Sequence, residues 1–333
     1  MTGVSRVNRA LTAITLASIY AVILYILVWG IDRSSGGQRE LLLVVGLVLF
    51  PMAVASLVTI VAEPTGEGGL GRPLLRTAVT ITGIILISII LFQEGGICVV
   101  MAAPFLYAGG ALGTVATVWL LRKFRRRSAR LLIVLPFIGL PIEPHIVYPD
   151  RYSEVRTVIE IAAPPAIVWR QTVEIPNIQP DELSWTFSHG IVGVPRPEDP
   201  RIDGEGVGAV RHLRWGQGIH FEEIVTAWEE KRFLAWNFHF GPGSIPPKVE
   251  AHIDVDSRYL HLQSGDYRLD EVPSGRTRLT LTTRYRIATP INAYCDWWGR
   301  IFLGDFHGIV VDVIRQRSEK EAAAISRTPS RFD

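Results

Sequence analysis

Long uncharged runs of apolar residues fill the first part of the chain. Four of them cover residues 10–31, 41–62, 77–93 and 95–121, and each contains 17 to 27 residues. A helix rises about 1.5 Å per residue, so about 20 apolar residues cross a hydrocarbon core of about 30 Å. We therefore predict four transmembrane helices within residues 1–130. A cleaved signal peptide is the alternative for the first run, although its apolar core would be shorter.

A fifth apolar run, residues 131–142, decides which side of the membrane the rest of the chain occupies. It is short and contains Pro136 and Pro141, so we expect an apolar interfacial linker over residues 131–150. With four spans, ten Lys and Arg residues near the span ends share one side and two lie on the other. The basic side is expected to be cytoplasmic. If the fifth run crosses the membrane, the soluble domain lies on the opposite side.

After residue 150 the hydrophobic pattern changes to short alternating segments. Residues 277–287 alternate apolar and polar positions, the period of a strand with one buried face. Thr289-Pro290 ends the strand, and Asn292 is a candidate helix cap. Residues 292–317 then carry apolar side chains three, four and seven positions apart, which predicts a long amphipathic helix.

The other segments of this half give the order of its elements. One strand (155–162) is followed by two short helices (166–173, 180–188), strands at 207–215, 219–228, 233–240, 249–256, 259–269 and 277–287, and the final helix. Short connections favour antiparallel pairing, because parallel strands need crossover helices. The predicted class is α+β, with a curved antiparallel sheet around the C-terminal helix in a domain over residues 151–322. Residues 323–333 are expected to be a disordered tail.

Charge separates the two halves further. Residues 1–149 contain 12 basic and 6 acidic residues, whereas the remainder contains 22 and 26. The soluble half therefore lacks the basic excess of a nucleic-acid-binding domain, and no nucleic-acid partner is expected. Cys98 and Cys295 lie in different halves, so no disulfide is expected.

Four local motifs in the second half suggest a family. They are Val158–Trp169 (a strand, Ala-Pro, then a helix with Val-Trp), Gly206-Val207-Gly208-Ala209-Val210-Arg211, Phe221–Trp228 and Gly275–Leu279. In this order, over about residues 154–320, they resemble the START-related helix-grip superfamily, which includes polyketide cyclases, plant pathogenesis-related allergens and lipid-transfer domains. The resemblance implies a sheet that grips a long helix and a cavity for a hydrophobic ligand. It does not identify a reaction, because one fold serves many functions.

The sequence contains no nucleophile elbow, phosphate loop or zinc-ligand cluster, so no metal or cofactor is expected and enzymatic activity is left uncertain. Polar and aromatic side chains expected on the cavity wall are the candidates for ligand binding. If Ile224 and Trp228 face inward, Glu222 does so too. The alternative for these charged groups is a structural ion pair of Arg211 with Glu222 or Asp305. The full set is Trp185, Arg211, Glu222, Trp228, Asn237, His239, Tyr285, Trp298 and Asp305.

These observations lead to three hypotheses. The first is a membrane-anchored protein that binds or transfers a hydrophobic small molecule, such as a lipid, quinone or polyketide, with the bilayer and that ligand as its partners. The second is a cyclase- or dehydratase-like enzyme in which Glu222, His239 or Asp305 moves protons. The third is an interaction or sensor module for a membrane-protein partner, with an exposed apolar patch.

Overall fold

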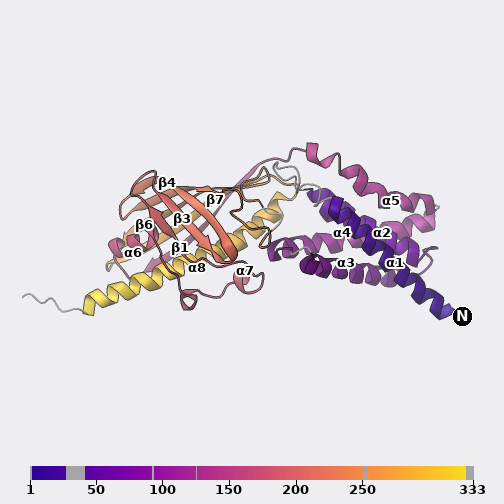
Figure 1. Cartoon of the computed structure of the whole chain (residues 1–333), viewed down its shortest axis with the longest axis horizontal. Helices are drawn as coiled ribbons and strands as arrows, with labels where there is room; N and C mark the ends of the chain where they lie inside the picture. The colour runs from indigo at the N-terminus through magenta and orange to yellow at the C-terminus, as the bar shows by residue number, and fades with distance from the viewer. Residues whose placement is uncertain (1, 28–41, 92–93, 125, 251–253, 328–333) are drawn as a thin grey trace, which may run out of the picture. The chain divides into compact units, whose positions relative to one another are not determined.

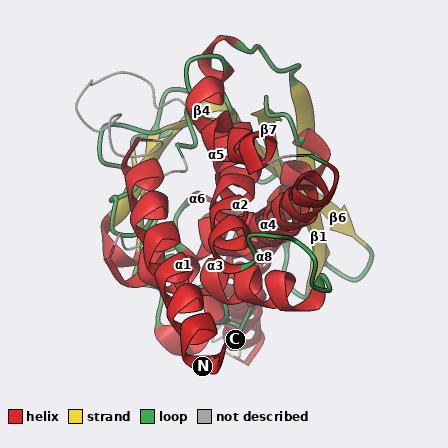
Figure 2. Ribbon diagram, turned by 90° about the vertical axis from the view of Figure 1, so that its right-hand side faces the viewer, coloured by secondary structure: helices red, strands yellow, loops and turns green. Residues whose placement is uncertain are grey.

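The computed structural model describes residues 2–27, 42–91, 94–124, 126–250 and 254–327. The chain divides into two compact units, Met1–Tyr148 and Pro149–Asp333 (Figure 1). Within the described residues the first unit is helical, and the strands belong to the second (Figure 2). Each unit is considered by itself below.

The first unit contains five α-helices among its described residues: α1 (Thr2–Tyr25), α2 (Phe50–Ala62, preceded by the π-helical turn η3, Val45–Leu49), α3 (Gly71–Leu91), α4 (Gly96–Lys123) and α5 (Arg126–Gly139). Three segments are long and apolar enough to span a membrane: Val45–Ala62, Gly71–Leu91 and Gly96–Lys123. The sequence predicted four. The described apolar part of α1, Leu11–Tyr25, is shorter, and residues 28–31 of the predicted span 10–31 lie outside the described residues.

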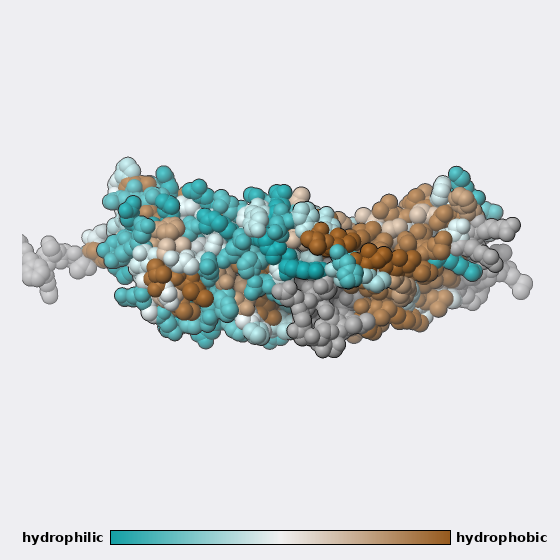
Figure 3. Space-filling model, turned by 90° about the horizontal axis from the view of Figure 1, so that it is seen from above, coloured by the Kyte–Doolittle hydropathy of each residue, from teal (hydrophilic) through white to brown (hydrophobic). Residues whose placement is uncertain are grey.

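Small and hydroxylated residues let these helices pack closely. A Cβ atom on Gly113 of α4 would lie 2.4 Å from the carbonyl oxygen of Met52, so this glycine permits contact with α2. The Thr117 hydroxyl donates to Ser56 Oγ at 2.9 Å across the same interface. Large apolar side chains such as Ile90 and Leu91 remain exposed, and the helical unit presents a mostly hydrophobic surface (Figure 3). Such a surface is compatible with membrane association.

The segment predicted as an interfacial linker packs within the first unit. Helix α5 occupies residues 126–139, and a 3₁₀ turn follows at Glu143–His145. The buried Glu143 carboxylate accepts the backbone N–H groups of Val44 (2.6 Å) and Val45 (2.7 Å). Because a helix N-terminus leaves its first N–H groups unpaired, this carboxylate stabilises the start of the helix that continues into α2.

The second unit is built on one antiparallel sheet of seven strands in the order β1-β7-β6-β5-β4-β3-β2. The strands are β1 (Arg151–Ile161), β2 (Arg201–Asp203), β3 (Val210–Trp215), β4 (Ile219–Glu229), β5 (Phe233–His239), β6 (Leu260–Val272) and β7 (Arg276–Ile287). The helices are α6 (Pro165–Val173), α7 (Phe187–Gly190) and α8 (Asn292–Arg327), with 3₁₀ turns η5 (Pro180–Glu182) and η6 (Gly216–Gly218). This arrangement confirms the predicted α+β class and fits a helix-grip fold.

Helix α8 lies along one face of the sheet (Figure 1). On that face the alternate β7 residues Leu279, Leu281 and Tyr285 are buried, as predicted. Most of the predicted stripe of α8 is also buried, at Trp298, Phe302, Ile309, Val313 and Ile314, whereas Tyr294 and Ile301 are partly buried. Trp297 is exposed while Trp298 is buried, because adjacent residues of a helix point in different directions.

Several predicted boundaries were wrong. The predicted helix 180–188 is a 3₁₀ turn followed, after a gap, by the single turn α7. Of the predicted strand 249–256, residues 251–253 lie outside the described residues, and Asp256 forms an isolated bridge to His261. Helix α8 continues to Arg327, so residues 323–327 are not a disordered tail. Their neighbours Glu319–Ala324 are good helix formers, which explains the extension. Residues 328–333 lie outside the described residues.

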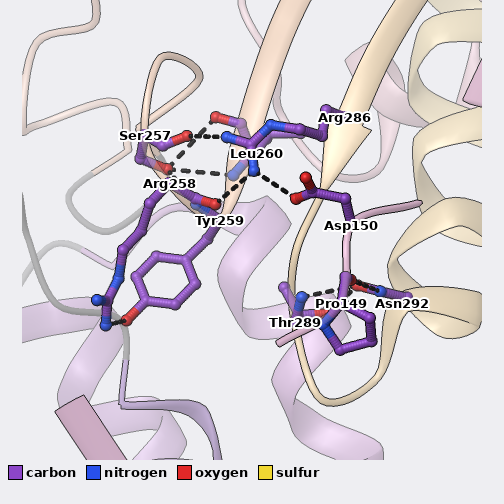
Figure 4. A network of polar contacts seen from close by, with 9 residues as sticks. All are labelled: Pro149, Asp150, Ser257, Arg258, Tyr259, Leu260, Arg286, Thr289 and Asn292. Atoms are coloured by element: carbon purple, nitrogen blue, oxygen red, sulfur yellow. Dashed lines mark hydrogen bonds and ion pairs between the residues drawn. The ribbon is translucent and has the colours of Figure 1, made fainter. Parts of the chain in front are cut away.

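A polar network fixes the point where the chain enters the second unit (Figure 4). The Arg286 guanidinium donates to Asp150 Oδ1 at 2.8 Å and to the carbonyl oxygens of Arg258 and Ser257 at 3.0 and 3.1 Å. Asn292, predicted as the helix cap, is instead the first residue of α8. Its side chain donates to the Pro149 carbonyl at 2.8 Å and accepts the Thr289 N–H at 2.7 Å. These contacts join the start of β1 to the start of α8.

Candidate functional site

A β-bulge in β4 determines which acid faces the helix side of the sheet. Val225 pairs with Trp236, but the next paired residue, Ala227, pairs with Ala235, so Thr226 is an extra residue. The extra residue reverses the alternation of side chains. Trp228 and Glu223 therefore both face inward, whereas Ile224 is exposed and the Glu222 side chain is 42% exposed. The prediction that Glu222 shares a face with Trp228 was wrong because it counted through the bulge.

Arg211 and Glu223 form a buried ion pair on the inner face. They lie opposite each other on β3 and β4, with 2.6 Å between Arg211 Nη1 and Glu223 Oε2. Their exposed fractions are 2% and 4%. The guanidinium carbon lies 5.0 Å from the ring centre of Trp236 and 5.7 Å from that of Tyr267. Arg211 is thus partnered by Glu223, one of the buried residues that the sequence reading missed, and not by Glu222 or Asp305.

The backbone conformation of the loop before β3 requires the two glycines of the motif that ends at Arg211. Gly206 and Gly208 have φ angles of +80° and +92°, a region that residues with a Cβ rarely adopt. The turn then brings Ala209 and Val225 into mutual backbone contact, with the Val225 N–H donating to the Ala209 carbonyl at 2.9 Å. This pairing sets the register that places Arg211 opposite Glu223.

Burial dominates the electrostatics of this pair. It raises the pKa of Glu223 to about 7, and the Arg211 charge and the Trp236 indole offset the effect only in part. Burial also raises the pKa of Tyr267 to about 12, against the lowering effect of Arg211. A carboxyl group with a pKa near neutrality exchanges a proton readily, which is the property of a general acid or base.

A second group of polar residues lies where α7 meets α8. Asp305 of α8 accepts the backbone N–H and the hydroxyl of Ser188 at 2.7 and 2.6 Å. The adjacent His189 is 8% exposed, and its Nδ1 lies 2.5 Å from Thr186 Oγ1. Burial lowers the pKa of His189 to about 4; Arg196 adds to this effect and Asp305 opposes it. The imidazole is therefore neutral at pH 7.

Tyr285 belongs to a third group at the beginning of α8. Its hydroxyl donates to Asp296 Oδ1 at 2.8 Å. Arg151 and Arg300 donate to Oδ2 of the same carboxylate at 2.8 and 3.3 Å. Burial raises the pKa of Asp296, but hydrogen bonds from Ser153, Tyr285 and Arg151, with the Arg300 charge, outweigh it and lower the pKa to about 2. The carboxylate is fully paired, which suits a structural role.

His307 connects α8 to the edge strand β1 and to its neighbour β7. Its Nδ1 lies 3.2 Å from Thr157 Oγ1 on β1, and its Nε2 lies 2.8 Å from Thr283 Oγ1 on β7. Burial lowers its pKa to about 4. A neutral imidazole has one donor and one acceptor, and a threonine hydroxyl can match either. Both ring nitrogens are therefore used within the fold.

The structure places the nine predicted site residues in three environments. Arg211, Tyr285 and Trp298 are buried; Trp228 and Asp305 are partly buried; Trp185, Glu222, Asn237 and His239 are not on the inner face. Asn237 and His239 do share a face with Phe233 and Ala235, but the inward residues of β5 are Leu234 and Trp236. The sequence predicted correctly which β5 residues share a face, but it assigned the wrong face to the inside. Trp185 is 67% exposed in the loop before α7.

The buried titratable residues that sequence reasoning missed include Glu223, His189, Asp296 and His307. Of these, His307 had a detectable signal. His307 lies five positions after Phe302 and two before Ile309, close to the apolar stripe of α8. The positions of Glu223 and His189 depend on the β4 bulge and on an irregular segment, which have no periodic signal. Within the described ranges, no three His, Cys, Asp or Glu side chains converge as metal ligands would.

Comparisons with known proteins leave the family open. No family model and no curated protein matches the chain. Among solved structures, it is similar to the Zhui aromatase/cyclase from Streptomyces sp. R1128, with 18% identity over 54% of this chain and 99% of that one and a TM-score of 0.33. It is also similar to Ara h 8.0201 (14% identity, 49% and 99% coverage, TM-score 0.29) and to norcoclaurine synthase from Thalictrum flavum (9%, 50% and 94%, 0.31). At such low similarity these structures indicate neither ligand nor activity.

Proposed function

We propose that this chain is a membrane-anchored protein that binds or transfers a hydrophobic small molecule between the inner face of the sheet and α8. The observation that carries the proposal is the environment of Arg211. Its guanidinium is buried against the rings of Trp236 and Tyr267, which also contact each other, and its Nε has no hydrogen-bond partner among the described residues.

An arginine in this position is costly for the fold alone. Burying a charged pair removes two ions from water, and well-packed apolar residues often stabilise a core equally well. An unpaired buried N–H adds about 1–3 kcal/mol to that cost. The combination is typical of ligand sites, where a few polar groups in an aromatic wall orient an otherwise apolar molecule. Arg211 would therefore orient the polar end of the ligand.

The membrane-compatible helices supply the reason for anchoring. Hydrophobic ligands partition into bilayers, so a binding domain attached to a membrane meets them at high local concentration. The basic residues near the ends of the apolar helices favour a cytoplasmic second unit. Proteolysis of sealed, inside-out vesicles tests this orientation: cleavage within residues 151–327 is expected there and protection in right-side-out vesicles.

Co-purification tests the binding function directly. The full chain, purified in lipid nanodiscs, is extracted with organic solvent, and the extract is compared with that of empty nanodiscs. A bound hydrophobic compound in stoichiometric amount, or saturable uptake of a lipophilic fluorophore, is expected. Arg211→Met should reduce this uptake about tenfold, since hydrogen bonds to charged groups contribute about 1.5–3 kcal/mol. Absence of both signals would contradict the proposal and favour the interaction module.

The environment of Glu223 favours a second candidate function. A buried carboxyl group with a pKa of about 7, next to an arginine that can stabilise an enolate, suits a cyclase- or dehydratase-like reaction. Glu223 would then move the proton, in place of Glu222 and His239. Conversion of a poly-β-ketone analogue by the natural chain, with loss of conversion in Glu223→Gln but retained binding, is the expected result. Equal conversion by both proteins would exclude this role.

A further inference from the structure

Strand β1 forms one edge of the seven-stranded sheet and is long and regular. It contains 11 residues and pairs with β7 along its whole length without a bulge, whereas β2, at the other edge, contains three residues. An edge strand carries backbone N–H and C=O groups that point away from its neighbour and can pair with another strand. Very short strands, prolines and bulges commonly protect such an edge. Strand β1 has none of these three features.

The outer face of β1, on the side of the sheet away from α8, carries both apolar and charged side chains. In chain order they are Tyr152, Glu154, Arg156, Val158 and Glu160, and all five are exposed. Tyr152 is 66% exposed and Val158 is 49% exposed. Two large apolar side chains therefore lie in water on the same edge strand, with a charged residue of each sign between them.

The charges on this outer face are satisfied to different degrees. Glu160 contacts two arginines of β7 at 2.8 and 3.1 Å, and Glu154 has one longer contact of 3.6 Å with another arginine of that strand. The Arg156 side chain has no hydrogen bond or ion pair within the part of the chain that the structure describes. Its neighbour on β7 is Thr282, which has no charge. The open edge of the sheet is where an acid can reach Arg156.

A second copy of β1 supplies such an acid when the two strands run antiparallel. A twofold axis perpendicular to the sheet keeps outer residues opposite outer residues. With Val155 on this axis, Glu154 of each copy faces Arg156 of the other. Tyr152 of each copy then faces Val158. Opposite charges and apolar side chains that face each other across two strands both stabilise the pairing.

Other registers of the same two strands are less complementary. An axis at Glu154 or at Arg156 places like charges opposite each other. An axis at Thr157 places Glu154 opposite Glu160. An axis at Val158 pairs Arg156 with Glu160, whose charge the arginines of β7 already offset. Axes nearer either end of β1 leave fewer residues paired, so the side chains favour the register centred on Val155.

The remaining positions of this register are compatible with pairing. On the inner face Val155 faces itself and Ser153 faces Thr157, and these side chains are small. Beyond the paired residues, Asp150 of one copy approaches Glu160 of the other. Arginines of β7 contact both acids at 2.8 Å, which reduces the repulsion between them.

We propose that two copies of this chain associate through β1 and extend the sheet across a twofold axis at Val155. The interface is isologous, because each copy contributes the same residues to it. The two charge pairs and the two apolar pairs select a second copy of the chain over other extended segments. This inference concerns the edge of the sheet and does not depend on what the domain binds.

Disulfide cross-linking of the full chain in lipid vesicles tests the register. Tyr152→Cys and Val158→Cys are combined in one chain, in which Cys98 and Cys295 are replaced by serine. Opposite residues of an antiparallel pair have Cα atoms about 4.5–5.5 Å apart, which is within the range of a disulfide. The double variant is therefore expected to form a covalent dimer on mild oxidation.

The two single-cysteine variants are the matched controls. In each of them the cysteines of the two copies are six positions apart along the paired strands, about 20 Å, and should not react with each other. The same spacing prevents a disulfide within one chain of the double variant. A double variant that stays monomeric, or single variants that cross-link to the same extent, would overturn the inference.

Charge reversal gives an independent measurement of the same interface. Arg156→Glu places two acids opposite each other at both charge pairs, and Glu154→Arg places two arginines there. Each variant should associate with itself about tenfold more weakly than the natural chain does. Co-purification of full chains that carry two different tags measures this association.

A mixture of the two charge variants is the control for folding. One copy then has two acids and the other two arginines, so both charge pairs are again of opposite sign. We expect the mixed variants to co-purify as well as two natural copies do, which requires that both proteins are folded. Mixed variants that associate no better than either variant alone would overturn the inference.

Discussion

Glu223 and Asp296 are two buried acids of one domain that reach opposite electrostatic states. Both are at most 4% exposed, and both have an arginine partner within hydrogen-bond distance. The pKa of Glu223 is raised to about 7, and that of Asp296 is lowered to about 2. Neither side chain is exposed to solvent, but Glu223 lies much deeper in the protein than Asp296, so burial itself contributes to the difference in pKa.

Depth of burial and the number of hydrogen-bond donors together explain the difference in pKa. Asp296 receives hydrogen bonds from Ser153, Tyr285 and Arg151 and the field of Arg300, which together exceed the effect of burial. Glu223 has Arg211 and the weaker influence of Trp236, which do not. A carboxylate that accepts several hydrogen bonds is fixed in place and has a structural role. One with few donors retains the capacity to exchange a proton or to accept a new partner, which makes Glu223 the better functional candidate.

Removal of Arg211 should have the largest effect on this comparison. Arg211→Met leaves Glu223 buried without a counter-charge, and we expect a loss of about 3–5 kcal/mol in the free energy of unfolding at pH 8. Urea unfolding of the full chain in detergent, followed by the near-ultraviolet circular dichroism of its tryptophans, measures this loss.

The double variant Arg211→Met, Glu223→Leu is the matched control. It replaces both charges with apolar groups and should recover most of the lost stability, because an apolar pair of similar volume has no desolvation cost. If the double variant is as unstable as the single one, the loss comes from packing around Trp236 and Tyr267, and the ion pair does not account for it.

The two acids should give pH dependences of opposite sign. Glu223 has a folded pKa of about 7 against an ordinary value of 4.5, so its contribution to stability is full below about pH 4.5 and is lost as pH rises to about 7. Asp296 has a folded pKa of about 2 against 3.8, so its contribution is full above about pH 4 and is lost as pH falls to about 2. Each slope is at most about 1.4 kcal/mol per pH unit.

Difference curves isolate these slopes from the other titrating groups. The free energy of unfolding of the natural chain minus that of Glu223→Gln should decrease as pH rises from about 4.5 to 7. The same difference taken with Asp296→Asn should decrease as pH falls from about 4 to 2. His189 and His307 are present in every protein compared, so their contributions cancel. A flat Glu223 difference curve would mean that the carboxylate stays charged throughout, and the enzyme candidate would lose its support.

The regular elements of this domain were predictable from the sequence, and its irregular positions were not. The period of β7 and the helical spacing of α8 placed Tyr285 and Trp298 correctly on the buried faces, because regular elements repeat their side-chain directions. Glu223 was missed because a single extra residue, Thr226, reverses the alternation. His189 was missed because the sequence from Ile175 to Gly204 has no hydrophobic period. The fold class depends on repeated patterns and was predictable, whereas the site depends on irregular positions.

The smallest expected effect concerns the outer partner of Asp296. The Arg300 side chain is 55% exposed and lies 3.3 Å from Asp296 Oδ2, one helical turn away. An exposed i,i+4 pair contributes about 0.3–0.5 kcal/mol because water and salt screen it. Arg300→Gln should therefore change the free energy of unfolding by no more than about 0.5 kcal/mol and shift the acid limb of the stability curve slightly upward in pH. Arg151→Gln, which removes the shorter 2.8 Å contact between β1 and α8, should do more in both measurements. If the two variants behave alike, the electrostatic field of the two arginines, and not the hydrogen bonds that they donate, keeps Asp296 ionised. The part of the explanation that rests on the number of donors would then have to be given up for both acids.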